Sequence, residues 1–262
     1  ITGTDVAKGA ADMVLTDDNF ASIEKAVEEG RGIFANIKKT IYFLISSNIA
    51  EVLAMFLIIC IGLPTPLIAI HLLWINLITD SLPAIALGMD KTSKDVLDEK
   101  PRNPEESIFA HGGMRLIIAR GAILTVSVLI AYFAAFAFNG AYSFSAIKAL
   151  SESDPNVLHQ AQTMAFTTLA FGELFHMFAM RNTEKSAFSV FASGNVMMFA
   201  AFFVGIALQF AVIEIPALQM IFNTANLSGY EWLITAICSL LPLLWQEIIA
   251  AVKALKRRKR NA

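Results

Sequence analysis

Long apolar runs separated by short polar stretches dominate this chain of 262 residues. We predict a membrane-crossing helix for each run of about 20 residues or more, because that length spans the roughly 30 Å hydrocarbon core of a bilayer. The expected spans are residues 37–61, 67–88, 114–138, 161–180, 195–214 and 230–252. The pattern therefore predicts an all-α polytopic membrane protein with six transmembrane helices.

The first of these helices is expected to begin well outside the membrane. From Ser22 onward, apolar positions recur with helical spacing and lead without interruption into the first apolar run. A helix over 22–61 would be about 60 Å long, twice the hydrocarbon thickness. We therefore predict a cytoplasmic stalk at 22–36, followed by the transmembrane domain at 37–252.

Residues 1–21 have the composition of a water-soluble domain rather than of a membrane segment. Met13, Val14 and Leu15 are predicted to form a short buried strand, because turn-forming acidic residues follow them directly. The chain has no initiator Met and no signal-peptide pattern. We expect it to be a fragment that opens in the middle of a domain.

Composition agrees with a membrane protein and excludes several other classes. Hydrophobic residues make up 56% of the chain and charged residues only 16%, whereas soluble domains carry about 25% charged residues. The net charge of -2 gives no electrostatic basis for nucleic-acid binding. Cys60 and Cys238 both lie in apolar runs, so we expect small buried side chains rather than a disulfide or a metal pair.

The placement of basic residues predicts the orientation in the membrane. The loops at 62–66, 139–160 and 215–229 contain a single basic residue, Lys148. The opposite side holds many more, including Arg31, Lys38, Lys39, Lys91, Lys94, Lys100, Arg102, Arg115, Arg120, Arg181, Lys185 and the KRRKR run of the tail at 253–262. By the positive-inside rule both termini are cytoplasmic, and the tail is expected to lie against anionic lipid.

The first two spans form a hairpin that carries polar residues inside its apolar runs. Asn48 and Glu51 are three residues apart, so they share a face of the first helix. On the second helix Asn76, Thr79 and Asp80 share a face in the same way. Because a short Pro-Thr-Pro turn makes the two helices antiparallel neighbours, we expect the two faces to meet at a similar depth.

Backbone chemistry adds a further oxygen to this hairpin. Pro83 has no N–H, so the carbonyl of Thr79 loses its usual helical partner. A carbonyl left unpaired within the membrane must find a neighbouring group, water or an ion. An ionised Asp80 near the middle of a membrane helix would itself cost roughly 2.5–3.5 kcal/mol on the insertion scale, which favours a functional role.

A third intramembrane acid, Glu173, lies in the fourth span. Together these residues offer carboxylates, amide oxygens, a hydroxyl and a backbone carbonyl, which is the oxygen-only ligand set of a hard cation such as Ca²⁺. Three carboxylates do not balance the charge of two Ca²⁺ ions, so a further acid from elsewhere is expected. Three acids clustered in a low dielectric cannot all stay charged without a cation, and proton uptake opposite to metal movement is a natural hypothesis.

Structural roles remain open for some of these groups. Polar residues of membrane bundles often serve only as interhelical hydrogen-bonding groups, and we assign that role to Gln209. Glu173 taken alone fits either role, and His176, on the same helix face, is expected to be a hydrogen-bonded packing residue. For the five polar residues of the hairpin together, beside a helix-breaking proline, we favour the ion site.

At this point the residues resemble a known family. The segments GTDVAKGAADMVLTDDNFASI, EEGRGIFANIKK, YFLISSNIAEV, LLWINLITDSLPAIALG and KPRNPEE resemble the C-terminal half of the type-II P-type ATPases, above all calcium pumps of the sarcoplasmic-reticulum type and their bacterial relatives. The resemblance covers essentially the whole chain and is most specific through residue 105. It implies a multi-pass protein of the bacterial plasma membrane.

The resemblance also assigns parts and ligands. It implies that residues 1–21 end an α/β phosphorylation domain and that the six spans are the last six of ten. It implies metal ligands at Asn48, Glu51, Asn76, Thr79, Asp80 and Glu173, with helix unwinding near Pro83. The amide at Asn76 favours calcium over sodium and potassium, and the acid at Glu51 favours two calcium ions per cycle.

The resemblance implies partners that this chain does not contain. These are the actuator, nucleotide and phosphorylation domains and the first four helices, with ATP and Mg²⁺ as cofactors of the parent. No catalytic residue is expected in this fragment, which should be inactive alone. The alternatives are a pump for Mn²⁺ or for Na⁺ and K⁺, a passive channel, or a non-transporting bundle. A DKTGT phosphorylation motif upstream of Ile1 would exclude the last two.

Overall fold

The computed structural model describes residues 3–17, 19–91, 96–98, 101, 103, 105–183, 186 and 195–261, of which 256–261 are described as backbone only. Within these residues every regular element is helical, which confirms the all-α membrane fold. The elements are α1 (Asp5–Ala10), α2 (Phe20–Cys60), α3 (Ala69–Trp74), η1 (Ile75–Asp80), α4 (Ser81–Gly88), α5 (Gly113–Phe138), α6 (Phe144–Ser153), α7 (Pro155–Arg181), α9 (Val196–Glu214), α10 (Pro216–Phe222), α11 (Gly229–Ser239) and α12 (Leu241–Asn261).

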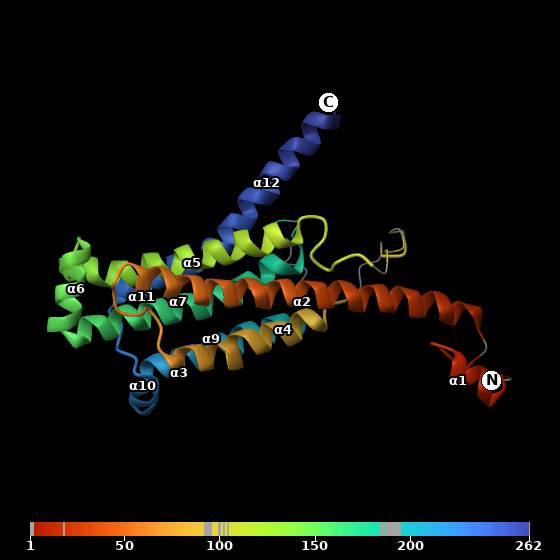
Figure 1. Ribbon diagram of the computed structural model, residues 1–262, viewed down its shortest axis with the longest axis horizontal. Helices are drawn as coiled ribbons and strands as arrows, with labels where there is room; N and C mark the ends of the chain where they lie inside the picture. The colour runs from red at the N-terminus through yellow and green to blue at the C-terminus, as the bar shows by residue number, and fades with distance from the viewer. Residues whose placement is uncertain are drawn as a thin grey trace.

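The stalk and the first span are one continuous helix, α2, of 41 residues. Its start is capped by the side chain of Asn19, which accepts a hydrogen bond of 3.0 Å from the backbone N–H of Ala21. Figure 1 shows α2 extending well beyond the bundle towards the N-terminus, where α1 lies apart from the other helices. A rigid helix therefore joins the N-terminal segment to the membrane bundle.

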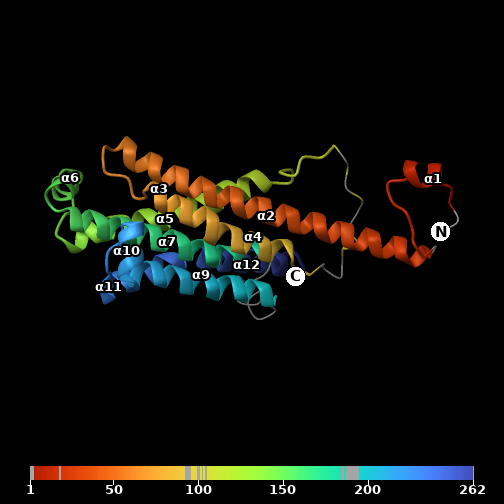
Figure 2. The ribbon, with the colours of Figure 1, turned by 90° about the horizontal axis from the view of Figure 1, so that it is seen from below.

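The centre of the bundle is α7, which α2, α5, α9, α11 and α12 surround (Figures 1 and 2). Among the described residues, five helical segments are long and apolar enough to cross a membrane: Phe20–Cys60, Ala69–Gly88, Gly113–Phe138, Val196–Glu214 and Gly229–Leu255. With 27 residues α7 is long enough, but it carries buried polar groups such as Thr163, Thr167 and Thr168. Because its neighbours enclose it, α7 does not need an apolar surface towards lipid, and its status as a sixth span stays a prediction.

Two expectations about local structure are wrong, and one predicted span contains a bend. Residues Met13–Leu15 form no strand, and Met13 and Val14 are exposed, because the described residues offer no neighbouring strand to pair with them. Cys60 is exposed rather than buried, since it ends α2 at the outer surface, whereas Cys238 is buried. The last span bends at Leu240 because Pro242 lacks an N–H and cannot continue the hydrogen bonding of α11.

Close packing of α2 against α5 depends on a glycine. A Cβ atom built on Gly121 would lie 2.6 Å from Cγ2 of Ile49 and 3.0 Å from the backbone oxygen of Ser46. The side chain of Ile49 could move, but the backbone oxygen of Ser46 is part of α2 itself. Any larger residue at position 121 therefore pushes the two helices apart.

We predict that Gly121→Ala lowers the free energy of unfolding by about 1–3 kcal/mol, the usual cost of overpacking. Gly30 is the matched control, because a Cβ there meets nothing within 4 Å. Gly30→Ala should stabilise α2 by roughly 0.5–1 kcal/mol through helix propensity. Thermal unfolding in detergent measures both, and equal effects at the two positions would contradict the close approach.

Candidate metal centre

The helix that carries Asn76, Thr79 and Asp80 widens into a π-helical turn over Ile75–Asp80. Side chains satisfy several of the carbonyls in and beside this turn. Ser81 Oγ donates to the Asn76 carbonyl at 3.0 Å, and Thr79 Oγ1 lies 3.2 Å from the Ile75 carbonyl. Single π turns inside α-helices are frequent at functional sites, and here the turn ends three residues before Pro83.

Three buried carboxyl groups from three different elements lie around this turn. The exposed fraction is 6% for Glu51 on α2, 2% for Asp80 at the end of η1, and 0% for Glu173 on α7. The Asn76 amide donates to Glu51 Oε2 at 3.3 Å, and the Thr79 hydroxyl donates to Glu173 Oε2 at 2.7 Å. The structure thus places residues that are 94 positions apart in the chain in direct contact.

The remaining carboxyl oxygens of the three acids lack partners. Glu51 Oε1, Glu173 Oε1 and both carboxyl oxygens of Asp80 are buried without a hydrogen-bond partner among the described residues. The charges of the three acids also lie close enough to interact electrostatically. Buried acceptors that lack donors are costly, so these oxygens form a site that favours a bound cation or protons.

The carboxylates do not converge on a single point in this arrangement. The described part of the chain contains no group of three or more His, Cys, Asp or Glu residues spaced to hold a metal ion. The contacts to Asn76 and Thr79 point one oxygen each of Glu51 and Glu173 towards the π turn. The acids are therefore gathered around a common region, but they do not form a closed coordination shell.

Asn48 lies away from the three acids. Its side chain is exposed and donates back to the Leu44 carbonyl of its own helix at 2.7 Å. It lines an open apolar groove with Val52 and Phe56. Residues three apart on an α-helix differ by about 60° in direction, so Glu51 points into the bundle while Asn48 faces outward.

Sequence reasoning missed Ser47 as a member of this site. Its side chain is fully buried beside the carboxyl group of Asp80, although no hydrogen bond joins them. Ser47 is four residues before Glu51 and therefore on the same face of α2. That spacing, together with a serine pair in an apolar run, was the available signal.

A second buried polar cluster lies nearby. His176 is fully buried and makes a hydrogen bond of 2.8 Å with Ser46 while stacking on Phe43, as expected for a packing residue. Arg120, placed by sequence among the cytoplasmic charges, is also buried and contacts Gln246 and the Pro242 carbonyl.

Gln209 accepts a hydrogen bond from Trp74, which confirms its interhelical role.

Comparison with known proteins decides the family. The family model for the C-terminus of cation-transporting ATPases matches residues 64–252. The chain belongs to this family. The matched range of this cation-transporting ATPase domain includes Asn76, Thr79, Asp80 and Glu173, whereas Glu51 lies in the stretch before it.

Curated relatives extend the similarity over almost the whole chain. The chain is 45% identical over 253 residues to "Calcium-transporting ATPase 1" of Bacillus cereus, and the match covers 97% of this chain and 28% of the relative. A "Calcium-transporting ATPase" of Bacillus subtilis is 40% identical, with 92% of this chain and 25% of the relative covered. The chain thus spans about a quarter of the length of these relatives, and the family resemblance predicted from the sequence motifs is confirmed.

The contact between Thr79 and Glu173 can be tested by removing one hydroxyl. Thr79→Val keeps the shape of the side chain but leaves the Glu173 carboxyl without its hydrogen-bond donor. We expect a loss of about 1–3 kcal/mol in the free energy of unfolding, the usual cost of an unsatisfied buried group. Thermal unfolding in detergent without added calcium measures it.

Thr235→Val is the matched control for this change. Thr235 is also fully buried, but its hydroxyl has no hydrogen-bond partner in the described structure. Its replacement should leave stability unchanged or slightly raised. If the two variants have the same melting temperature, the hydrogen bond between Thr79 and Glu173 does not contribute to stability.

Proposed function

We propose that this chain is the C-terminal, ion-binding part of an ATP-driven calcium pump. One observation supports it above all: carboxyl groups from α2, η1 and α7 are buried around one π turn with acceptor oxygens left free. Ca²⁺ takes 6–8 oxygen ligands in flexible geometry. Glu51, Asp80 and Glu173 would supply negative charge, with Asn76, Thr79 and Asn48 as neutral oxygen ligands.

The names of the relatives favour calcium among the hard cations. Two bound calcium ions carry more positive charge than three carboxylates neutralise, so a further acid would come from upstream helices.

Apolar side chains next to Asn48 and Asn76, such as Val52, Phe56 and Leu77, are exposed on the outer face of α2 and η1. Upstream helices packed there would cover these side chains and turn Asn48 into an enclosed ligand.

The chemistry of ATP would belong to the upstream domains. The parent would use ATP with Mg²⁺ and form an aspartyl phosphate, and this chain would contribute no catalytic residue and be inactive alone. Phosphorylation would tilt the rigid helix α2 and move Glu51 relative to Asp80. That displacement would weaken the site and release calcium away from the cytoplasmic side.

Proton movement in the opposite direction would follow from the same geometry. Once calcium leaves, three neighbouring buried carboxylates repel each other in a low dielectric and are stabilised by taking up protons. The pump would lie in the bacterial plasma membrane in contact with lipid, with both termini in the cytoplasm.

We predict that Asp80→Asn abolishes calcium-dependent phosphorylation from ATP in the complete pump, because it removes the carboxylate at the π turn. Asp98→Asn is the control, since Asp98 is exposed in the connection after α4. Phosphoenzyme formation with radiolabelled ATP measures both variants. Normal calcium transport by Asp80→Asn would overturn the site assignment.

Ion identity and proton exchange are tested on reconstituted vesicles. Among Ca²⁺, Mn²⁺, Na⁺ and K⁺, calcium alone should stimulate ATP hydrolysis at micromolar concentration. A pH-sensitive dye on the side that receives calcium should report proton loss from that side during transport. Stimulation by another cation would contradict the assignment of calcium as the transported ion. An unchanged pH would contradict proton exchange.

A further inference from the structure

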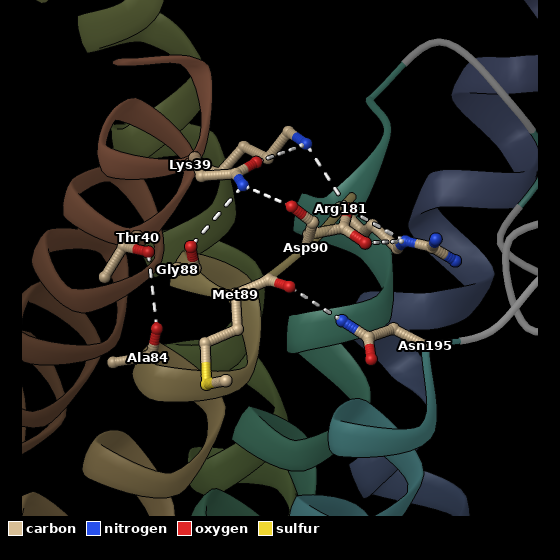
Figure 3. A network of polar contacts seen from close by, with 9 residues as sticks. Lys39, Thr40, Ala84, Gly88, Met89, Asp90, Arg181 and Asn195 are labelled. Carbon is tan, nitrogen blue, oxygen red and sulfur yellow. Dashed lines mark hydrogen bonds and ion pairs between the residues drawn. The ribbon is translucent and has the colours of Figure 1, made fainter. Parts of the chain in front are cut away.

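A network of charged and polar groups joins several helices at the cytoplasmic end of the bundle (Figure 3). Its centre is Asp90, two residues after α4, whose side chain is only 4% exposed. Arg181, the last residue of α7, donates from Nε to both carboxyl oxygens at 3.0 and 3.1 Å. Lys39 of α2 approaches Asp90 Oδ2 at 3.5 Å.

Amide groups tie the backbone around Asp90 to the same helices. Asn36 of α2 donates to the Asp90 carbonyl at 2.6 Å and accepts from Lys39 Nζ at 3.2 Å. Asn195, which caps α9, donates to the Met89 carbonyl at 3.2 Å. The segment after α4 is thereby held between α2, α7 and α9, as Figure 3 shows.

Each charged residue of this network lies on, or directly after, a helix that carries one of the three buried acids. Lys39 is on the helix of Glu51, Asp90 follows the helix of Asp80, and Arg181 ends the helix of Glu173. In each case the charge lies on the cytoplasmic side of the acid, between about two and three and a half helical turns away. Each acid-bearing helix thus either carries one member of the ion triad Lys39–Asp90–Arg181 or, for Asp90, leads into it within two residues.

We propose that Asp90 is a positioning residue that sets the spacing of Glu51, Asp80 and Glu173 through this ion triad. The inference rests on the proposed function, since it assigns a calcium affinity to that spacing. A buried carboxylate between two cations holds the helix ends together. Without it Lys39 and Arg181 would lose the carboxylate that both contact, and the helix ends would separate.

The direct test combines a distance measurement with calcium binding in the complete pump. Spin labels are attached through Ile37→Cys on α2 and Ile85→Cys on α4, both exposed, in a Cys60→Ser background. Asp90→Asn should lengthen and broaden the distance between the labels. It should also weaken calcium binding roughly five- to tenfold, within the usual range of coupling between distant sites.

Matched variants separate positioning from general destabilisation. Asp98→Asn removes the same charge from an exposed site in the same connection and should change neither readout. Tyr132→Phe removes a hydrogen bond of 2.6 Å to the Pro64 carbonyl near the opposite end of the bundle and should lower the melting temperature without affecting calcium affinity.

The outcomes distinguish this inference from the proposed function. If Asp80→Asn abolishes calcium binding while Asp90→Asn changes only one readout or neither, the positioning role is overturned and the proposed function stands. If the unmodified pump binds no calcium, the proposed function fails. The effect of Asp90 on calcium affinity then fails with it. Should Asp90→Asn not fold, Lys39→Gln removes the more exposed member of the triad and must move both readouts in the same direction.

Discussion

The burial of three acids between helices is the constraint on which the arrangement of this domain depends. Apolar helices could pack in many ways, but a carboxyl group removed from water requires donors, protons or a cation close by. The π turn brings Asn76 and Thr79 to Glu51 and Glu173. Both carboxyl oxygens of Asp80 have no hydrogen-bond partner within the described part of the chain, so they retain the capacity to accept a cation.

The position of α7 follows from the same constraint. A helix that carries Glu173, His176 and several buried threonines cannot face lipid on those sides, so it lies inside a ring of more apolar helices. The helices around it supply the partners for its polar groups, for example Ser46 for His176. Polarity inside the bundle and apolar surface outside are therefore two consequences of one arrangement.

The buried acids and the ion triad lie at two different depths along the same helices. The acids lie within the bundle, and the ion triad lies at the end of the bundle from which α2 extends towards the N-terminus. Because α2 continues beyond this end as an unbroken helix, a movement of the stalk reaches the triad before it reaches Glu51. The continuous helix α2, the ion triad and the three acids therefore follow one another along the same part of the domain.

Much of this organisation could be predicted from the sequence. Hydrophobic periodicity alone predicted the long helix, the hairpin and the all-α class, because lipid requires every backbone group to be satisfied within the helix itself. The spacing of Asn76, Thr79 and Asp80 predicted a shared polar face, but in the π turn Thr79 and Asp80 are buried whereas Asn76 is exposed. Pro83 marked the place where that helix departs from regular geometry.

Contacts between distant segments could not be read in this way. That Thr79 bonds Glu173, that Ser47 lies beside Asp80 and that Asn48 faces outward depends on how α2, η1 and α7 are rotated against one another. The same holds for Arg120, which the sequence places near the cytoplasm and the fold buries. The sequence by itself determined which helices form and which faces carry polar groups, because those are local properties. Only the tertiary structure decided which polar faces meet, because helix rotation is set by packing across the whole bundle.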